Sequence, residues 1–251
     1  MRSQKHRLWA AATAPLTLAL VAIAGCSNDP ADEATELVVL GDSLAEESMQ
    51  YVHLLTSEKE FKPNFFGGTA PCDWLERDVE ADDTSIVIIT FTGNSQTPCM
   101  ADEPGGFLDG EALVAKYESD LESLVEKARD DGARVLLVGQ PIRRDDVGGN
   151  DEVEALNELY RRLAEQEFVS FVDAGAGLEN PDGTYAQELP CIPDEPECRD
   201  TGTNLVRNDD GLHFCPGGPH QGACPTYASG AWRFALKVVE AVNNPDSFER
   251  A

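Results

Sequence analysis

The chain contains few basic residues. Of its 251 residues, 19 are lysine or arginine and 46 are aspartate or glutamate, which gives a formal charge of −27. A surface with this charge repels nucleic acid and anionic lipid headgroups, so we expect neither as a partner. The acidity does not by itself identify a substrate.

Cysteine pairs of the zinc-binding type are also absent. There is no Cys-x-x-Cys pair, and the six cysteines after Cys26 are scattered among prolines and glycines. An even number of cysteines in an exported chain predicts disulfides rather than a zinc site. Six cysteines allow 15 pairings. We expect no metal and no cofactor.

Long apolar runs are confined to the N-terminus. Three basic residues precede an apolar run over residues 10–24, which is too short to span a bilayer comfortably. The run ends in Ile23-Ala24-Gly25-Cys26, which resembles the lipobox of bacterial lipoproteins, in which the cysteine carries the lipid. The alternative is a plain secretory signal with a chance cysteine.

We therefore predict a signal peptide over residues 1–25, a polar tether over residues 26–35 and one domain over residues 36–251. The lipobox resemblance implies lipidation at Cys26 and a position on the outer face of the bacterial cell membrane. Without lipidation the protein would be secreted. The lipid would be its one contact with the membrane, and we expect a monomer.

Compact apolar runs alternate with segments of helical periodicity. This pattern predicts a parallel sheet covered on both faces. We predict an α/β fold, a flavodoxin-like three-layer α/β/α sandwich with a five-stranded parallel sheet in the order 2-1-3-4-5. The expected strands are 36–40, 61–66, 85–91, 134–138 and 168–172, and the expected helices are 44–57, 111–131, 151–167 and about 226–242. Residues 175–208 are expected to be irregular.

Ser43 follows the first strand in Gly41-Asp42-Ser43-Leu44. Its hydroxyl should lie at the carboxyl end of that strand and its amide at a helix N-terminus, where ligands and developing negative charge are favoured. Gly-Asp-Ser also forms ordinary capped turns, and we assign Asp42 to that structural role. On this pattern alone a capped turn is the simpler interpretation, and Ser43 is a candidate nucleophile that the remaining chain has to support.

A nucleophilic serine needs a base, and only His53, His213 and His220 follow the signal segment. His53 lies within the first helix, and no acid lies near His220 in sequence. His213 is preceded three residues earlier by Asp210, which can accept its Nδ1 proton in a tight turn. Asp-Gly is also a common surface turn, so Asp210 and His213 are at this point candidates for the acid and the base that would act with Ser43.

Donors for a tetrahedral oxyanion should come from the loops after the flanking strands. These loops would supply the amide of Gly67 or Gly68 and the side chain of Asn94, in addition to the amide of Ser43 after the first strand. The loops after strands two and three should also bring Cys72 and Cys99 together. Cys191 with Cys198, and Cys215 with Cys224, then remain as local pairs.

Together these segments resemble the SGNH or GDSL hydrolases. Gly41-Asp42-Ser43-Leu44, Gly67-Gly68, Gly93-Asn94 and Asp210-x-x-His213 look like the family's four blocks, in the family's order. The family usually has Gly-x-Asn-Asp in the third block, whereas Gly93 here directly precedes Asn94. The resemblance implies a catalytic triad of Ser43, His213 and Asp210 and the three oxyanion donors named above.

The resemblance also implies hydrolysis or transfer of acyl groups. No broad apolar lid for a long acyl chain surrounds Ser43 in the sequence. The leading hypothesis is a serine esterase that removes short, acetyl-like groups from a polar ester, with a small-molecule or glycan substrate. The alternatives are an O-acyltransferase acting on envelope glycan with the same triad, and a non-catalytic carbohydrate-binding or assembly protein on the same fold.

Overall fold

One parallel sheet forms the centre of the protein. The computed structural model describes residues 34–101, 106–218, 222–244 and 248. Five strands pair in the order β2-β1-β3-β4-β5, which confirms the predicted fold class and strand order. The strands are β1 (Glu36–Gly41), β2 (Glu60–Phe65), β3 (Ser85–Thr90), β4 (Arg134–Val138) and β5 (Val169–Val172).

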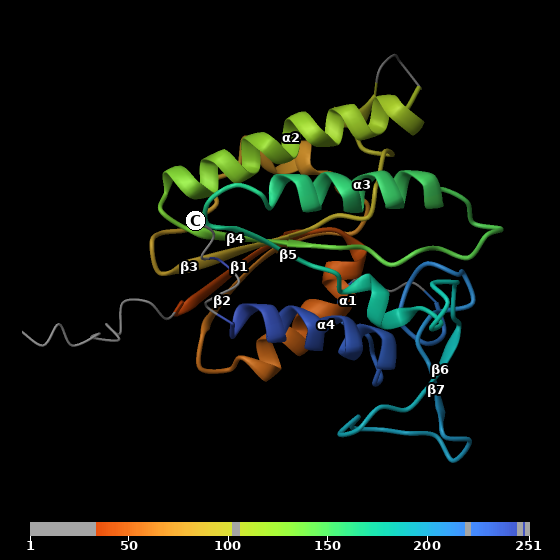
Figure 1. Ribbon diagram of the computed structural model, residues 1–251. Helices are drawn as coiled ribbons and strands as arrows, with labels where there is room; N and C mark the ends of the chain where they lie inside the picture. The colour runs from red at the N-terminus through yellow and green to blue at the C-terminus, as the bar shows by residue number, and fades with distance from the viewer. Residues whose placement is uncertain (1–33, 102–105, 219–221, 245–247, 249–251) are drawn as a thin grey trace, which may run out of the picture.

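Two long helices cover each face of this sheet (Figure 1). Helices α1 (Ser43–Leu55) and α4 (Ser229–Val242) lie on one side, and α2 (Gly110–Asp130) and α3 (Asn150–Leu163) lie on the other. Strand β3 shows why the strands are continuously apolar: Ile86 and Ile88 pack toward α1 and α4, while Val87 and Ile89 pack toward α2 and α3.

The segment predicted to be irregular contains a short antiparallel hairpin, formed by β6 (Glu188–Pro190) and β7 (Thr203–Leu205). Strands of three residues carry no detectable periodicity, so the sequence pattern did not predict them. Three 3₁₀ helices complete the described elements: η2 (Pro71–Trp74), η3 (Pro98–Met100) and η4 (Gly175–Leu178).

Several predicted boundaries differ from the structure by one to four residues, two of them on either side of residues 164–168. The third long helix ends at Leu163 rather than residue 167, and the fifth strand begins at Val169 rather than Phe168. Phe168 has a φ of 62° and is 49% exposed, so the chain turns sharply there before it enters the sheet. An apolar residue beside a strand was therefore wrongly assigned to that strand.

The predicted signal segment, including Cys26, lies outside the described residues. Ala34, in the predicted tether, is buried, and its carbonyl accepts a hydrogen bond from Lys59. The amide of the next residue, Thr35, donates to the Thr84 carbonyl. These last two tether residues therefore contact the domain. In the described part of the chain, no helix is both long enough and apolar enough to cross a membrane.

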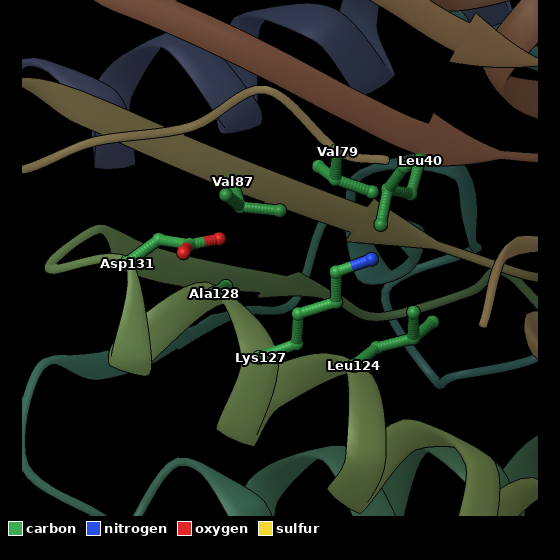
Figure 2. Close-up of a pocket in the computed structure, with 7 residues that line it drawn as sticks. All are labelled: Leu40, Val79, Val87, Leu124, Lys127, Ala128 and Asp131. Atoms are coloured by element: carbon green, nitrogen blue, oxygen red, sulfur yellow. The ribbon is translucent and has the colours of Figure 1, made fainter. Parts of the chain in front are cut away.

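A small cavity lies between the sheet and α2 (Figure 2). Its volume is about 10 Å³, close to the lower limit for a single water molecule. Its lining is mainly apolar and includes Leu40, Val87 and Leu124, with Lys127 and Asp131 at one side. It contains none of the predicted catalytic residues and is a packing defect of the core.

Glu195 ties the hairpin region to α4. Its carboxylate accepts hydrogen bonds from Arg233 and Asn204, each at 2.7 Å, and from the Ser229 hydroxyl. Burial would raise the pKa of Glu195, but these hydrogen bonds lower it to about 2. The side chains of Glu195 and Arg233 are almost completely buried, at 1% and 5% exposure.

We expect Glu195→Gln to destabilise the fold by about 3 kcal/mol at pH 7, because it leaves the buried Arg233 unpaired. The pKa of Glu195 is lower in the folded state than the value of about 4.3 in unfolded chains. Its contribution is therefore present above pH about 4.3 and is lost as the pH falls toward 2. Denaturant unfolding between pH 2 and 7 should show this dependence in the wild type and in the exposed control Glu165→Gln. An equally steep dependence in Glu195→Gln would contradict the assignment.

Candidate active site

Ser43 is the first residue of α1, directly after β1. Asp42 caps the helix, and its Oδ1 accepts the Leu44 amide at 3.2 Å. Gly41 is needed at this turn, because a Cβ there would lie 2.5 Å from the Cβ of Ala45. The turn therefore directs the Ser43 side chain toward the carboxyl edge of the sheet, as the sequence pattern predicted.

Ser43, His213 and Asp210 form a continuous hydrogen-bonded chain. The Oγ of Ser43 lies 3.0 Å from Nε2 of His213, and Nδ1 of His213 lies 2.7 Å from Oδ2 of Asp210. The other Asp210 oxygen accepts the amides of Leu212 and His213, each at 2.9 Å. Such an arrangement fixes the tautomer of the imidazole and leaves Nε2 free to accept the serine proton.

The electrostatics of Asp210 favour its ionised form. Partial burial would raise the pKa of Asp210. Hydrogen bonds from the amides of His213 and Leu212 and from the His213 ring outweigh this effect and lower the pKa overall. Gly211 closes this turn with a φ of 76°, and its carbonyl accepts the amide of Arg144 at 3.0 Å. The acid is thus held in place by its own turn and by the loop after β4.

Two backbone amides beside Ser43 are available to an oxyanion. Neither the Ser43 N–H nor the Gly67 N–H has an acceptor among the described residues. A Cβ on Gly67 would lie 3.7 Å from the Cβ of Ser43, whereas a Cβ on Gly68 would have no neighbour within 4 Å. Of the two predicted glycines, Gly67 is therefore the one that lies beside the nucleophile.

Asn94 lies at the same edge, but its amide group is engaged. Its Nδ2 donates to Oδ2 of Asp42 at 2.9 Å and to the Thr69 carbonyl at 3.2 Å. An oxyanion would have to take over the longer of these bonds, the one to Thr69. The hydroxyl of Tyr117 on α2 donates to the Asn94 carbonyl at 2.9 Å and holds this loop in place.

Asp42 joins the serine turn to the asparagine loop. It is fully buried, and its Oδ2 accepts the amide and the hydroxyl of Thr92, each at 2.7 Å, as well as the Asn94 amide. Burial raises the pKa of Asp42, and the Thr92 hydrogen bonds oppose that rise. The sequence interpretation assigned Asp42 to a cap. It did not foresee this second role, because Thr92 is 50 residues away.

The other histidines lie elsewhere. His53 is exposed and packs against Phe61, with ring centroids 4.8 Å apart. His220 is outside the described residues. Two groups of potential metal ligands occur in the described residues, Cys72 with Asp73 and Cys99, and Glu47 with Cys215 and Cys224. Both groups contain a disulfide pair, so their sulfur atoms are not thiolates.

The six cysteines form the three predicted disulfides, Cys72–Cys99, Cys191–Cys198 and Cys215–Cys224. The first joins the loops that carry Gly67 and Asn94, and a hydrogen bond of 2.8 Å from Thr97 to Asp73 joins the same loops. Three disulfides are typical of a protein that folds in an oxidising compartment outside the cytoplasm.

We expect Cys72→Ser with Cys99→Ser to lower kcat more than it raises KM, because the bridge braces the loops that carry Gly67 and Asn94, the predicted oxyanion donors. The bridge spans a sequence separation of 27 residues, so its loss should cost about 3–4 kcal/mol of stability. Steady-state kinetics and thermal unfolding would measure both effects, with Cys191→Ser and Cys198→Ser as the matched control. A folded variant with unchanged kcat would mean that the bridge has no influence on the site.

Solved structures with the same fold include several hydrolases. Axe2, an acetylxylan esterase from Geobacillus stearothermophilus, is 14% identical, with a TM-score of 0.55 over 87% of this chain and 98% of that chain. LAE5, an alpha/beta hydrolase enzyme from the metagenome of Lake Arreo, is 15% identical, with a TM-score of 0.54 over 87% and 98%. The C-terminal catalytic domain of peptidoglycan O-acetyltransferase A from Streptococcus pneumoniae is 16% identical, with a TM-score of 0.50 over 85% and 95%. At identities this low the comparison shows similarity of fold alone, which rests on the TM-scores of 0.50 to 0.55.

No curated protein matches the chain in sequence. A family model does match residues 69–223. This range includes the Asn94 loop, the Asp210–His213 turn and five of the six paired cysteines, and it ends just before Cys224. Because the match covers more than half of the chain, the protein belongs to the family described as a protein of unknown function, DUF459.

Proposed function

We propose that the protein is a serine esterase of the SGNH type. The observation that carries the proposal is the chain of contacts at 3.0 Å and 2.7 Å through Ser43, His213 and Asp210. It stands at the edge of the sheet where open α/β folds bind ligands. The sequence blocks that resemble SGNH hydrolases contain the same three residues.

The proposed reaction proceeds through an acyl-enzyme. Oγ of Ser43 attacks the ester carbonyl carbon while Nε2 of His213 takes the hydroxyl proton. The amides of Ser43 and Gly67, with the side chain of Asn94, stabilise the oxyanion. The intermediate collapses when the ester C–O bond breaks, and the alcohol leaves with the proton from His213. Water then attacks the acyl carbon with His213 again acting as the base, and releases the carboxylic acid.

The borders of the site favour a short acyl group on a polar alcohol. A Cβ on Gly67 would lie 3.0 Å from the Glu46 carboxylate, so an acidic acceptor for substrate hydroxyls stands next to the nucleophile. The neighbouring Phe66 is 57% exposed and offers one aromatic face. Trp74, the other large aromatic residue of this loop region, is buried and forms no part of an acyl-binding surface. A carbohydrate ester fits these surroundings.

The test combines a fluorophosphonate probe with acetyl and octanoyl esters of 4-nitrophenol. We expect a single adduct on the peptide that contains Ser43 and higher kcat/KM for the acetyl ester. A protein that folds but is neither labelled nor active would support the non-catalytic binding alternative. If a soluble glycan were acylated in preference to release of free acid, the acyltransferase alternative would replace hydrolysis.

The proposed enzyme would act outside the cytoplasm, where disulfides form. Lipidation of Cys26 would hold it at the outer face of the cell membrane. The glycan substrate, the monomeric state and the lipid anchor remain predictions from the sequence.

A further inference from the structure

Glu47 is a buried acid that the proposed reaction does not use. It lies on α1 one helical turn after Ser43, and none of its surface is exposed. Its Oε2 accepts the amide of Phe214 at 2.6 Å and the amide of Cys215 at 3.2 Å. A buried carboxylate is costly unless it is hydrogen-bonded, and here both donors come from the two residues that follow His213.

Arg207 is a buried cation that contacts the segment around His213. Its guanidinium donates to the Leu212 carbonyl at 2.9 Å and to the Ile142 carbonyl at 3.1 Å, and it lies 4.9 Å from the Phe214 ring centroid. Only 1% of its surface is exposed. Within the described residues no carboxylate lies within 4.0 Å of this guanidinium.

The two groups hold the peptide groups on both sides of His213. Arg207 binds the carbonyl of the residue before it, and Glu47 binds the amide of the residue after it. Because Glu47 and Ser43 share one helix, this contact fixes the base relative to the nucleophile. Burial raises the pKa of Glu47, and the hydrogen bond from the Phe214 amide and the favourable interaction with a protonated His213 oppose that rise.

We propose that Glu47 and Arg207 are positioning residues that hold His213 within reach of Ser43, and that the charge of Glu47 stabilises the imidazolium formed during acyl transfer. This inference rests on the proposed esterase function. It assigns two separable effects to Glu47, one that depends on the length of its side chain and one that depends on its charge.

The charges around this segment define the expected pH response. His213 faces the carboxylates of Asp210, Asp42 and Glu47, and Glu47 in turn faces Asp210 and Arg207. Removal of the Glu47 charge would disfavour the protonated imidazole of His213. The acid limb of the pH profile of kcat/KM should therefore move to lower pH. A role limited to packing would leave that limb unchanged.

Glu47→Gln tests the charge, and Glu47→Asp tests the length. We expect Glu47→Gln to lower kcat about tenfold to a hundredfold with less than a twofold change in KM, because the imidazolium that forms in the transition state loses a nearby negative charge. Its acid limb should move to lower pH. Glu47→Asp should also lose kcat but keep the wild-type acid limb. Glu58→Gln, an exposed acid beyond the end of α1, should behave as the wild type.

The outcomes separate this inference from the proposed function. If the wild type is not labelled by fluorophosphonate, the esterase assignment itself fails. If the wild type is labelled and Glu47→Gln keeps its kcat and its acid limb, only the positioning role is overturned. Should Glu47→Gln not fold, Glu47→Asp decides: wild-type kcat contradicts the proposal, and reduced kcat with an unchanged KM supports the positioning role.

Discussion

Ser43→Ala should reduce ester hydrolysis by at least about a thousandfold and abolish fluorophosphonate labelling. Losing the nucleophile of a triad removes the acyl-enzyme route, and the remaining oxyanion donors give only residual catalysis. The fold should not change, because the hydroxyl makes one side-chain contact, the 3.0 Å contact with His213. Initial rates with 4-nitrophenyl acetate, together with circular dichroism, would measure both.

The matched control is Ser57→Ala, an exposed serine just after α1. It should keep wild-type rates and labelling. Wild-type rates in Ser43→Ala would mean that hydrolysis takes place at another group, and the esterase proposal would have to be abandoned.

Asn94→Ala should lower kcat by about 10²–10³-fold with little change in KM. One oxyanion donor contributes about this much, because it stabilises charge that develops only in the transition state. In the structure this amide donates to Asp42 and to the Thr69 carbonyl, so the variant also removes a hydrogen bond from a buried carboxylate. A second variant must separate the two effects.

Thr92→Val provides that separation. It removes the 2.7 Å hydrogen bond from the Thr92 hydroxyl to Asp42 but removes no oxyanion donor. We expect Thr92→Val to lower stability while kcat falls less than tenfold. If both variants lose the same factor in kcat, Asn94 acts through Asp42 and not on the oxyanion. Unchanged kcat in Asn94→Ala would remove it from the site altogether.

Much of the site could be predicted because its parts follow strand ends. The apolar runs located β1 and β3, and the residues after them, Ser43 and Asn94, could then be placed at one edge of the sheet. The predicted triad followed from the scarcity of histidine, the spacing of Asp210 and His213, and the resemblance of these segments to SGNH hydrolases. The same loop geometry led to the Cys72–Cys99 pair.

Long-range polar contacts could not be predicted. Glu47 follows another glutamate on a helix, and such a residue is normally exposed, yet its carboxylate binds an amide 167 residues away. Arg207 lies in a loop of mixed polarity and gives no sign of its complete burial. The spacing to Thr69 only slightly favoured Gly67 over Gly68, and it is the fold that brings Gly67 beside Ser43.

One face of α1 carries Ser43, Glu47 and Tyr51, and all three contact a late segment of the chain. Ser43 contacts His213, and Glu47 binds the Phe214 amide. The Tyr51 hydroxyl accepts the Ala228 amide at 3.1 Å. The fifth strand ends at Val172, so every strand of the main sheet is synthesised before the base. During synthesis the chain therefore carries Ser43 for some time before the His213 segment exists. If the protein is the proposed esterase, its activity would arise only when the late segment docks on the first helix, and it would therefore report completed folding.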